Sequence, residues 1–135
     1  MTDTWGMSAE VEKPRRASPV ARGAVNPFAA GYRVTETQFQ TQVIELAHLF
    51  GYKCAHFRPA QTSRGWRTPV QADGKGFPDL ILCKPGRLLA VELKAEKKKP
   101  SAEQEAWLEW FREAGASTYL WHPSDWERIV EVLRD

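Results

Sequence analysis

Two short apolar runs joined by a Pro-Gly dipeptide constrain the fold of this chain more than any other feature. The runs cover residues 80–84 and 87–93, are rich in Leu, Ile and Val, and are bounded by turn residues, as is typical of β-strands. Pro presets the backbone for the first central position of a β-turn, so Pro85 and Gly86 predict a tight connection. Because a two-residue turn fixes the strand register, we expect an antiparallel hairpin with one defined pairing.

This register brings two acidic side chains together. If Lys84 pairs with Arg87, then Asp79 lies directly opposite Glu92. Directly opposed side chains have Cβ atoms roughly 4.5 to 5.5 Å apart, and like charges so placed repel each other. Something must therefore neutralise them. Lys94, on the same face of the strand as Glu92, is one candidate, and a divalent cation with oxygen ligands is the other.

The alternation of side chains predicts where this charged group lies. Glu92 and Lys94 point to one side of the strand, whereas Leu89, Val91 and Leu93 point to the other, where they would pack on a helix. We expect the charged face to be a surface or a cleft. An ordinary solvated Glu-Lys pair is the alternative, but the Pro-Asp dipeptide at matching spacing favours a functional site.

Helical spacing and turn residues predict the remaining elements. Capping-box patterns begin a helix at Thr35, a second at Ser101 and a third at Ser124. We expect helices over residues 35–50, 101–114 and 124–133, and further strands over 52–57 and 117–121. The order is helix, three strands, helix, strand, helix, which predicts a mixed α/β fold with an antiparallel hairpin and a crossover.

The segment over residues 58–76 is predicted to be a loop. A loop of this length is uncommon in a compact domain unless it is functional or mobile. Its basic and aromatic residues suit DNA, and we take the following as candidate contacts: Arg58, Arg64, Trp66, Arg67 and Lys75. Trp66 would stack on a base or wedge into a distorted junction, although a loop tryptophan more often covers a hydrophobic edge.

Charge is unevenly divided along the chain. Residues 51–100 carry eleven basic and four acidic residues, whereas residues 101–135 carry three basic and eight acidic residues. The positive block contains the predicted hairpin, and phosphate backbones are the expected partner for such a field. Lys97 and Lys98 in the run that follows the hairpin are further candidate DNA contacts, the alternative being a solubilising loop before a helix.

Composition limits the class of protein. The 135 residues permit one domain of ordinary size, which we place at residues 34–135 after a flexible, basic, Pro-containing tail over 1–33. Cys54 and Cys83 fall in predicted strands, where we expect them in the core rather than in a zinc site or a disulfide. No apolar run approaches the ~18 residues of a membrane span, so we expect a cytoplasmic protein that does not bind membranes.

The second predicted helix bears an apolar stripe made of Trp107, Trp110, Phe111 and Ala114. We expect this stripe to be mostly core. Together with Leu108, however, Trp110 widens the apolar surface beyond what one core contact needs. Since large exposed apolar patches usually mark interfaces, the stripe favours a homodimer, with burial of Trp110 within the same subunit as the alternative.

The Pro-Asp, hairpin and Glu-X-Lys arrangement resembles the PD-(D/E)XK nuclease superfamily, and further features resemble its virus-type replication-repair branch, the VRR-NUC domain. Residues 76–80 are similar to that branch's Gly-X-Pro-Asp-Leu, residues 92–94 to its Glu-X-Lys strand, and residues 101–107 to its Ser-X-X-Gln helix start followed by an aromatic residue. The resemblance covers about residues 35–133. It implies a restriction-endonuclease-like core with a mixed sheet.

The resemblance also implies a metal site. Asp79, Glu92 and the backbone carbonyl of Leu93 would bind Mg²⁺, with Mn²⁺ as a substitute. The family also uses an acidic residue on its first helix, and Glu36 is the position that matches.

Two further site residues and a function follow from the same resemblance. Lys94 would assist the attacking water, and Gln104 would join the site, although its amide also suits a helix cap. The implied activity is a metal-dependent endonuclease that hydrolyses DNA phosphodiesters. Stand-alone domains of this branch resemble the Holliday-junction or flap-processing nucleases of phage, which act in DNA repair and recombination. A noncatalytic DNA-binding accessory module with the same fold and a purely structural domain are the alternatives.

Overall fold

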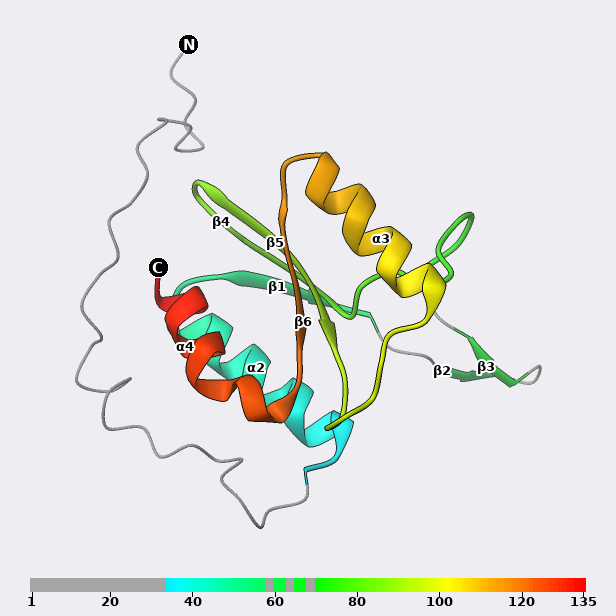
Figure 1. The fold of residues 1–135 in the computed structure, drawn as a ribbon, viewed down its shortest axis with the longest axis horizontal. Coiled ribbons are helices and arrows are strands. Elements are labelled where there is room, and N and C mark those ends of the chain that lie inside the picture. The colour runs from blue at the N-terminus through cyan, green and yellow to red at the C-terminus, as the bar shows by residue number, and fades with distance from the viewer. Residues whose placement is uncertain (1–33, 58–59, 63–64, 68–69) are drawn as a thin grey trace.

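The computed structural model of this protein describes residues 34–57, 60–62, 65–67 and 70–135, so the predicted tail lies outside the described residues. Its centre is a four-stranded mixed sheet of order β1-β4-β5-β6. Helices α2 and α4 lie on one side of this sheet and α3 on the other (Figure 1). The main elements are α2 (Glu36–Leu49), β1 (Lys53–His56), β4 (Leu80–Lys84), β5 (Arg87–Leu93), α3 (Ala102–Glu113), β6 (Ser117–Trp121) and α4 (Trp126–Arg134).

The predicted hairpin and its register are confirmed. Strands β4 and β5 pair antiparallel from Lys84↔Arg87 at the turn to Leu80↔Val91. Gly86 has a φ of 79°, the left-handed conformation that the second turn position requires of it. Strand β1 pairs antiparallel with β4, whereas β6 runs parallel to β5. A parallel pair needs a crossover, and α3 supplies it, as the α/β prediction requires.

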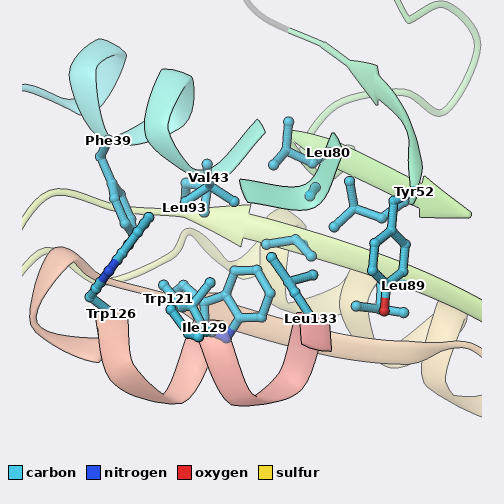
Figure 2. Close-up of a cluster of buried hydrophobic side chains, with 14 residues drawn as sticks. Phe39, Val43, Tyr52, Leu80, Leu89, Leu93, Trp121, Trp126, Ile129 and Leu133 are labelled. Atoms are coloured by element: carbon cyan, nitrogen blue, oxygen red, sulfur yellow. The ribbon is translucent and has the colours of Figure 1, made fainter. Parts of the chain in front are cut away.

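The main core lies between the sheet and the helix pair α2 and α4. Leu89, Val91 and Leu93 of β5 are fully buried there, as the alternation predicts. Phe39 of α2 and Trp126 of α4 point toward each other across this core (Figure 2). The other buried apolar members of the cluster are Val43, Ala47, Tyr52, Leu80, Leu82, Trp121, Ile129, Val130 and Leu133.

Two of the three predicted capping boxes are present. The Thr35 hydroxyl accepts from Gln38 N and the Gln38 side chain accepts from Thr35 N, so α2 begins where its sequence predicts. Ser101 and Gln104 exchange the same two hydrogen bonds at the start of α3. Gly51, with a φ of 88°, follows α2 in the left-handed conformation that commonly ends a helix.

The third capping box is wrong. A short 3₁₀ helix, η1 (Pro123–Asp125), precedes α4, which begins at Trp126 rather than at Ser124. The Ser124 backbone N–H and hydroxyl both donate to the carboxylate of Glu96, at 2.6 and 3.1 Å. Because Ser124 binds the distant Glu96, it does not cap the helix as the local sequence predicts.

The predicted loop over 58–76 contains a second, separate hairpin. Its strands are β2 (Ala60–Thr62) and β3 (Gly65–Arg67), which pair antiparallel. Strands of three residues are too short to show the alternation that identifies a strand in sequence, which is why the prediction missed them.

Helix α3 buries less than its sequence predicts. Trp107 and Phe111 are half-buried and both pack edge-on against Phe77, with ring centroids 5.0 and 5.7 Å from it. Trp110, by contrast, is 70% exposed, so its place in the predicted core is wrong. The helix packs over β5 and β6, and none of its side chains is fully buried because only its inner face meets the sheet.

The two cysteines also differ from the prediction. Cys54 is half-buried and Cys83 is exposed, and neither forms a disulfide. Cys83 lies near the hairpin turn on β4, opposite Leu88, which is itself 43% exposed. Since α3 packs over β5 and β6, the face that carries Cys83 and Leu88 at this end of the hairpin is left in solvent.

Polar contacts fasten the turn end of the hairpin to the rest of the fold. The Arg87 guanidinium donates to the hydroxyl of Tyr52 at 2.5 Å and to the carbonyl of Val132 in α4 at 2.6 Å. Lys84 Nζ lies 4.4 Å from the centre of the Tyr52 ring and donates to the Phe50 carbonyl. The hairpin is therefore held at its turn end by α4 and by the segment that follows α2. Within the described ranges, no helix combines the length and apolar character needed to cross a membrane.

Candidate active site

Asp79 stands at the end of the hairpin opposite the turn, immediately before β4. Its carboxylate Oδ2 accepts a hydrogen bond from the backbone N–H of Leu93 at 2.9 Å. Its carbonyl accepts from the N–H of Phe57, the residue that follows β1. These bonds tie Asp79 to the neighbouring strands on both sides, so the hairpin register places its carboxylate beside the end of β5.

Glu92, the predicted partner of Asp79, is only 1% exposed. Of the two expectations, a surface or a cleft, the open surface is wrong at this position, because α3 packs over β5 on the face that Glu92 shares with Ala90. Lys94 Nζ lies 3.8 Å from Glu92 Oε2. The other oxygen, Oε1, is buried and has no hydrogen-bond partner among the described residues. A buried carboxylate oxygen without a hydrogen-bond partner costs free energy.

The electrostatics of the pair follow from burial and proximity. Burial raises the pKa of Glu92 to about 8, the negative charge of Asp79 adds to this rise, and Lys94 opposes both effects. Burial also raises the pKa of Asp79, while the hydrogen bond from Leu93 lowers it. The charge of Glu36, in the first turn of α2, adds to the rise in the pKa of Asp79. Glu36 thus acts on the same end of the sheet as the carboxylate pair.

The donor set fits a hard divalent cation, although the side chains alone do not complete a site. Over the described ranges, no three His, Cys, Asp or Glu side chains lie close enough together to hold a metal ion. Asp79 and Glu92 supply oxygen donors, and Glu92 Oε1 has no hydrogen-bond partner in the described part of the chain. Since Mg²⁺ keeps several waters and binds through one or two carboxylates together with substrate phosphate, two acids and a backbone carbonyl are compatible with it.

Gly76 explains how the loop before Asp79 reaches α3. Its φ is 85°, and a Cβ atom at this position would lie 2.5 Å from the backbone carbon of Glu103 and 2.8 Å from the backbone nitrogen of Gln104. Only glycine allows this contact and this backbone conformation. The start of α3 is consequently packed against the segment that carries Asp79, and the sequence pattern alone does not reveal this reason for the glycine.

Replacing Gly76 by Ala is expected to lower the free energy of unfolding by about 2 kcal/mol or more, because strain at positive φ adds to a steric clash. Gly115→Ala is the matched control. Gly115 has a φ of 101°, but nothing lies within 4 Å of its added Cβ, so only the conformational strain applies. Thermal unfolding of both variants measures the difference. Equal losses would contradict the close packing of Gly76 on α3.

Gln104 has a structural role in the described contacts. Its side-chain oxygen accepts from Ser101 N at 2.8 Å, and its own N–H donates to the Ser101 hydroxyl at 3.2 Å. The helix start that it caps packs on Gly76, three residues before Asp79. The capping interpretation is confirmed, and a role in the site stays a prediction.

The predicted DNA contacts are described to different extents. Lys97 and Lys98 are exposed, and Lys75 has an 85% exposed side chain with its Nζ 4.0 Å from a carboxylate oxygen of Glu103. Arg58 and Arg64 lie outside the described residues, and for Trp66 and Arg67 the structure describes only the backbone of β3.

Residues that sequence reasoning did not select lie beside the exposed lysines. Glu96 binds Ser124, as described above, and the ring Nε2 of His122 lies 2.7 Å from the carbonyl of Lys98. These partners are at least 24 residues apart in sequence. No local spacing or capping pattern indicates such contacts, and only the parallel pairing of β5 with β6 brings them together.

Comparison with protein families matches the VRR-NUC domain to residues 35–124. The matched range covers most of the chain and contains the hairpin, the carboxylate pair and the start of α3. Comparisons with curated proteins and with solved structures gave no significant match.

Proposed function

This chain belongs to the VRR-NUC family of nuclease domains, and we propose that it is a Mg²⁺-dependent endonuclease that hydrolyses DNA phosphodiesters. The observation that carries the proposal is the buried carboxylate pair. Asp79 and Glu92 both have raised pKa values, and one oxygen of Glu92 has no hydrogen-bond partner among the described residues. Such an arrangement is costly unless a cation binds there, which is the chemistry that a nuclease of this family needs.

Asp79, Glu92 and the backbone carbonyl of Leu93 would hold the cation, with Glu36 as a further acid at the same end of the sheet. When bound, a divalent cation lowers the pKa of a coordinated water and stabilises negative charge on the phosphate. Glu92 must release its proton before it can act as a ligand, because only a carboxylate binds such a cation. Mn²⁺ is expected to substitute for Mg²⁺, since both accept oxygen ligands.

Lys94 is the residue that we assign to the attacking water. Its ammonium group lies 3.8 Å from Glu92, and its side chain is 18% exposed. It is therefore both close to the acids and accessible from solvent. The ammonium group of Lys94 offsets the repulsion between the two acids and donates a hydrogen bond that orients the water.

The substrate that we propose is branched DNA. The described residues give no recognition element for a base sequence, and the basic residues near the site suit contacts with the phosphate backbone. The test is to incubate the full chain with Mg²⁺ or Mn²⁺ and with linear duplex, flap, four-way junction and single-stranded DNA. We expect cleavage of the branched substrates that stops when a chelator is added. DNA binding without cleavage of any substrate would instead favour a noncatalytic accessory module.

Symmetric cleavage of a junction requires two sites, so we further propose a homodimer that uses the exposed Trp110. Glu109 and Glu113 on the same helix are also exposed. Because Glu109 is paired with Arg112, the charge that a two-fold contact would bring toward its copy is that of Glu113. We therefore expect weak association that strengthens with salt, because salt screens the repulsion. Light scattering at micromolar concentration should give about twice the 15.4 kDa chain mass. Trp110→Ala should restore the monomer mass, and a monomer for the unsubstituted chain at every salt concentration would remove the dimer.

A further inference from the structure

The connection between β5 and α3, residues 95–100, carries three consecutive exposed lysines, Lys97 to Lys99, and is called the lysine loop below. The loop contains a turn in which Lys98 N donates to the Ala95 carbonyl at 3.1 Å. Lys97 has a φ of 65°, a left-handed conformation that is unfavourable for a lysine.

Two side chains hold the lysine loop in place. Glu96 accepts from the Ser124 N–H at 2.6 Å and from the Ser124 hydroxyl at 3.1 Å. His122 Nε2 donates to the Lys98 carbonyl at 2.7 Å, since a carbonyl oxygen can only accept. Asp125 in turn accepts from the backbone N–H of His122. Both attachments lie on the short connection between β6 and α4.

This connection is itself fixed beside the carboxylate pair. Lys94 N donates to the Trp121 carbonyl at 3.0 Å, which extends the β5–β6 pairing to the residue before the lysine loop. Lys94 is also the residue whose ammonium lies 3.8 Å from Glu92. The loop therefore leaves the sheet directly at the candidate active site and is attached there by these hydrogen bonds.

We propose that the lysine loop is a preformed binding element for the DNA phosphates next to the cleaved bond, and that Glu96 and His122 are its positioning residues. The proposal rests on the proposed nuclease function. Preorganisation matters because ordering a flexible loop on binding costs conformational entropy, which a loop already held in place does not lose.

Charge alone predicts the opposite role for Glu96. A carboxylate among three lysines weakens the attraction of the loop for phosphate, so removing it should strengthen DNA binding. Glu96→Gln and Glu96→Ala remove the same charge, but only Gln retains an oxygen that accepts from Ser124 N. The comparison of these two variants therefore isolates the effect of loop position from the effect of charge.

The experiment measures binding of the full chain to a short DNA duplex by fluorescence anisotropy, without divalent metal and over a range of salt concentrations. We expect Glu96→Ala to bind about tenfold more weakly than Glu96→Gln. The slope of log K against log salt should fall by about 0.9 for each phosphate that the loop no longer binds. Lys53→Ala is the control. It removes an exposed lysine at the start of β1, opposite Cys83 near the hairpin turn, and should change neither quantity. Equal affinities and slopes for the two Glu96 variants would overturn the proposal.

A second variant tests the same proposal if Glu96→Ala does not fold. His122→Phe removes the bond to the Lys98 carbonyl and leaves the charges of the loop unchanged, so it should produce the same decrease in affinity and slope relative to the unsubstituted chain. Unchanged binding by a folded His122→Phe would also overturn the proposal. Because no cleavage is measured, a protein that binds in this way but never cuts DNA would overturn the proposed function alone.

Discussion

Replacing Glu92 by Gln is expected to lower the rate of Mg²⁺-dependent DNA cleavage about 10³-fold, which corresponds to about 4 kcal/mol of lost transition-state stabilisation. The substitution preserves the shape of a side chain that is 1% exposed, so the fold should be retained. It also removes the free-energy cost of keeping Glu92 protonated beside Asp79, a cost that grows as the pH rises. The melting temperature of the metal-free variant should therefore equal or exceed that of the unsubstituted protein.

Single-turnover cleavage of a branched DNA together with thermal unfolding measures both effects. Lys94→Ala should lose activity similarly, since it removes the ammonium group that lies 3.8 Å from Glu92. Glu45→Gln is the control, because Glu45 is an exposed acid in the body of α2. Full activity in both Glu92→Gln and Lys94→Ala would exclude this end of the hairpin as the active site.

The second large effect concerns pH and the stability of the metal-free protein. Burial raises the pKa of Glu92 from its ordinary value of 4.5 to about 8. Between these values the folded chain holds a proton that the unfolded chain has released. The stability that Glu92 contributes is therefore fully present below pH 4.5 and is lost as the pH rises through about 8. The slope within that window is about 1.4 kcal/mol per pH unit.

Other groups also titrate in this range, so the useful quantity is the difference between two proteins. The free energy of unfolding of Glu92→Gln minus that of the unsubstituted chain should increase with pH across the window, because only the carboxyl loses its proton. Denaturant unfolding in a chelator at pH 5, 6, 7 and 8 gives this difference. A constant difference would show that Glu92 has an ordinary pKa, despite its burial.

Local sequence rules predicted most of the fold because the relevant interactions are themselves local. The register of β4 and β5 depends on a two-residue turn, and the starts of α2 and α3 depend on side chains three residues apart. The family match confirms the resemblance that the same hairpin and helix start suggest. Sequence spacing was sufficient wherever both partners belong to one element or to adjacent ones.

The features that sequence did not predict depend on contacts between distant segments. The burial of Glu92 requires α3 to pack over β5, and the place of Ser124 is decided by Glu96. Trp110 follows the same apolar spacing as Trp107, yet only the latter faces Phe77. The spacing of apolar residues along α3 does not show how much of the helix surface the sheet covers. The sequence therefore predicted more buried residues on α3 than the structure has.

The exposed face at the turn end of the hairpin gives this protein a natural attachment point for a probe. Thiol reagents react with the thiolate, and burial raises the pKa of the Cys54 thiol, so Cys54 should react slowly at neutral pH. Cys83 is exposed and lies four residues along β4 from Asp79, a separation of roughly 13 Å for a strand. A dye attached to Cys83 would therefore be near the carboxylate pair without touching it. Fluorescence from such a dye would report the arrival and departure of DNA on a chain that carries no substitutions.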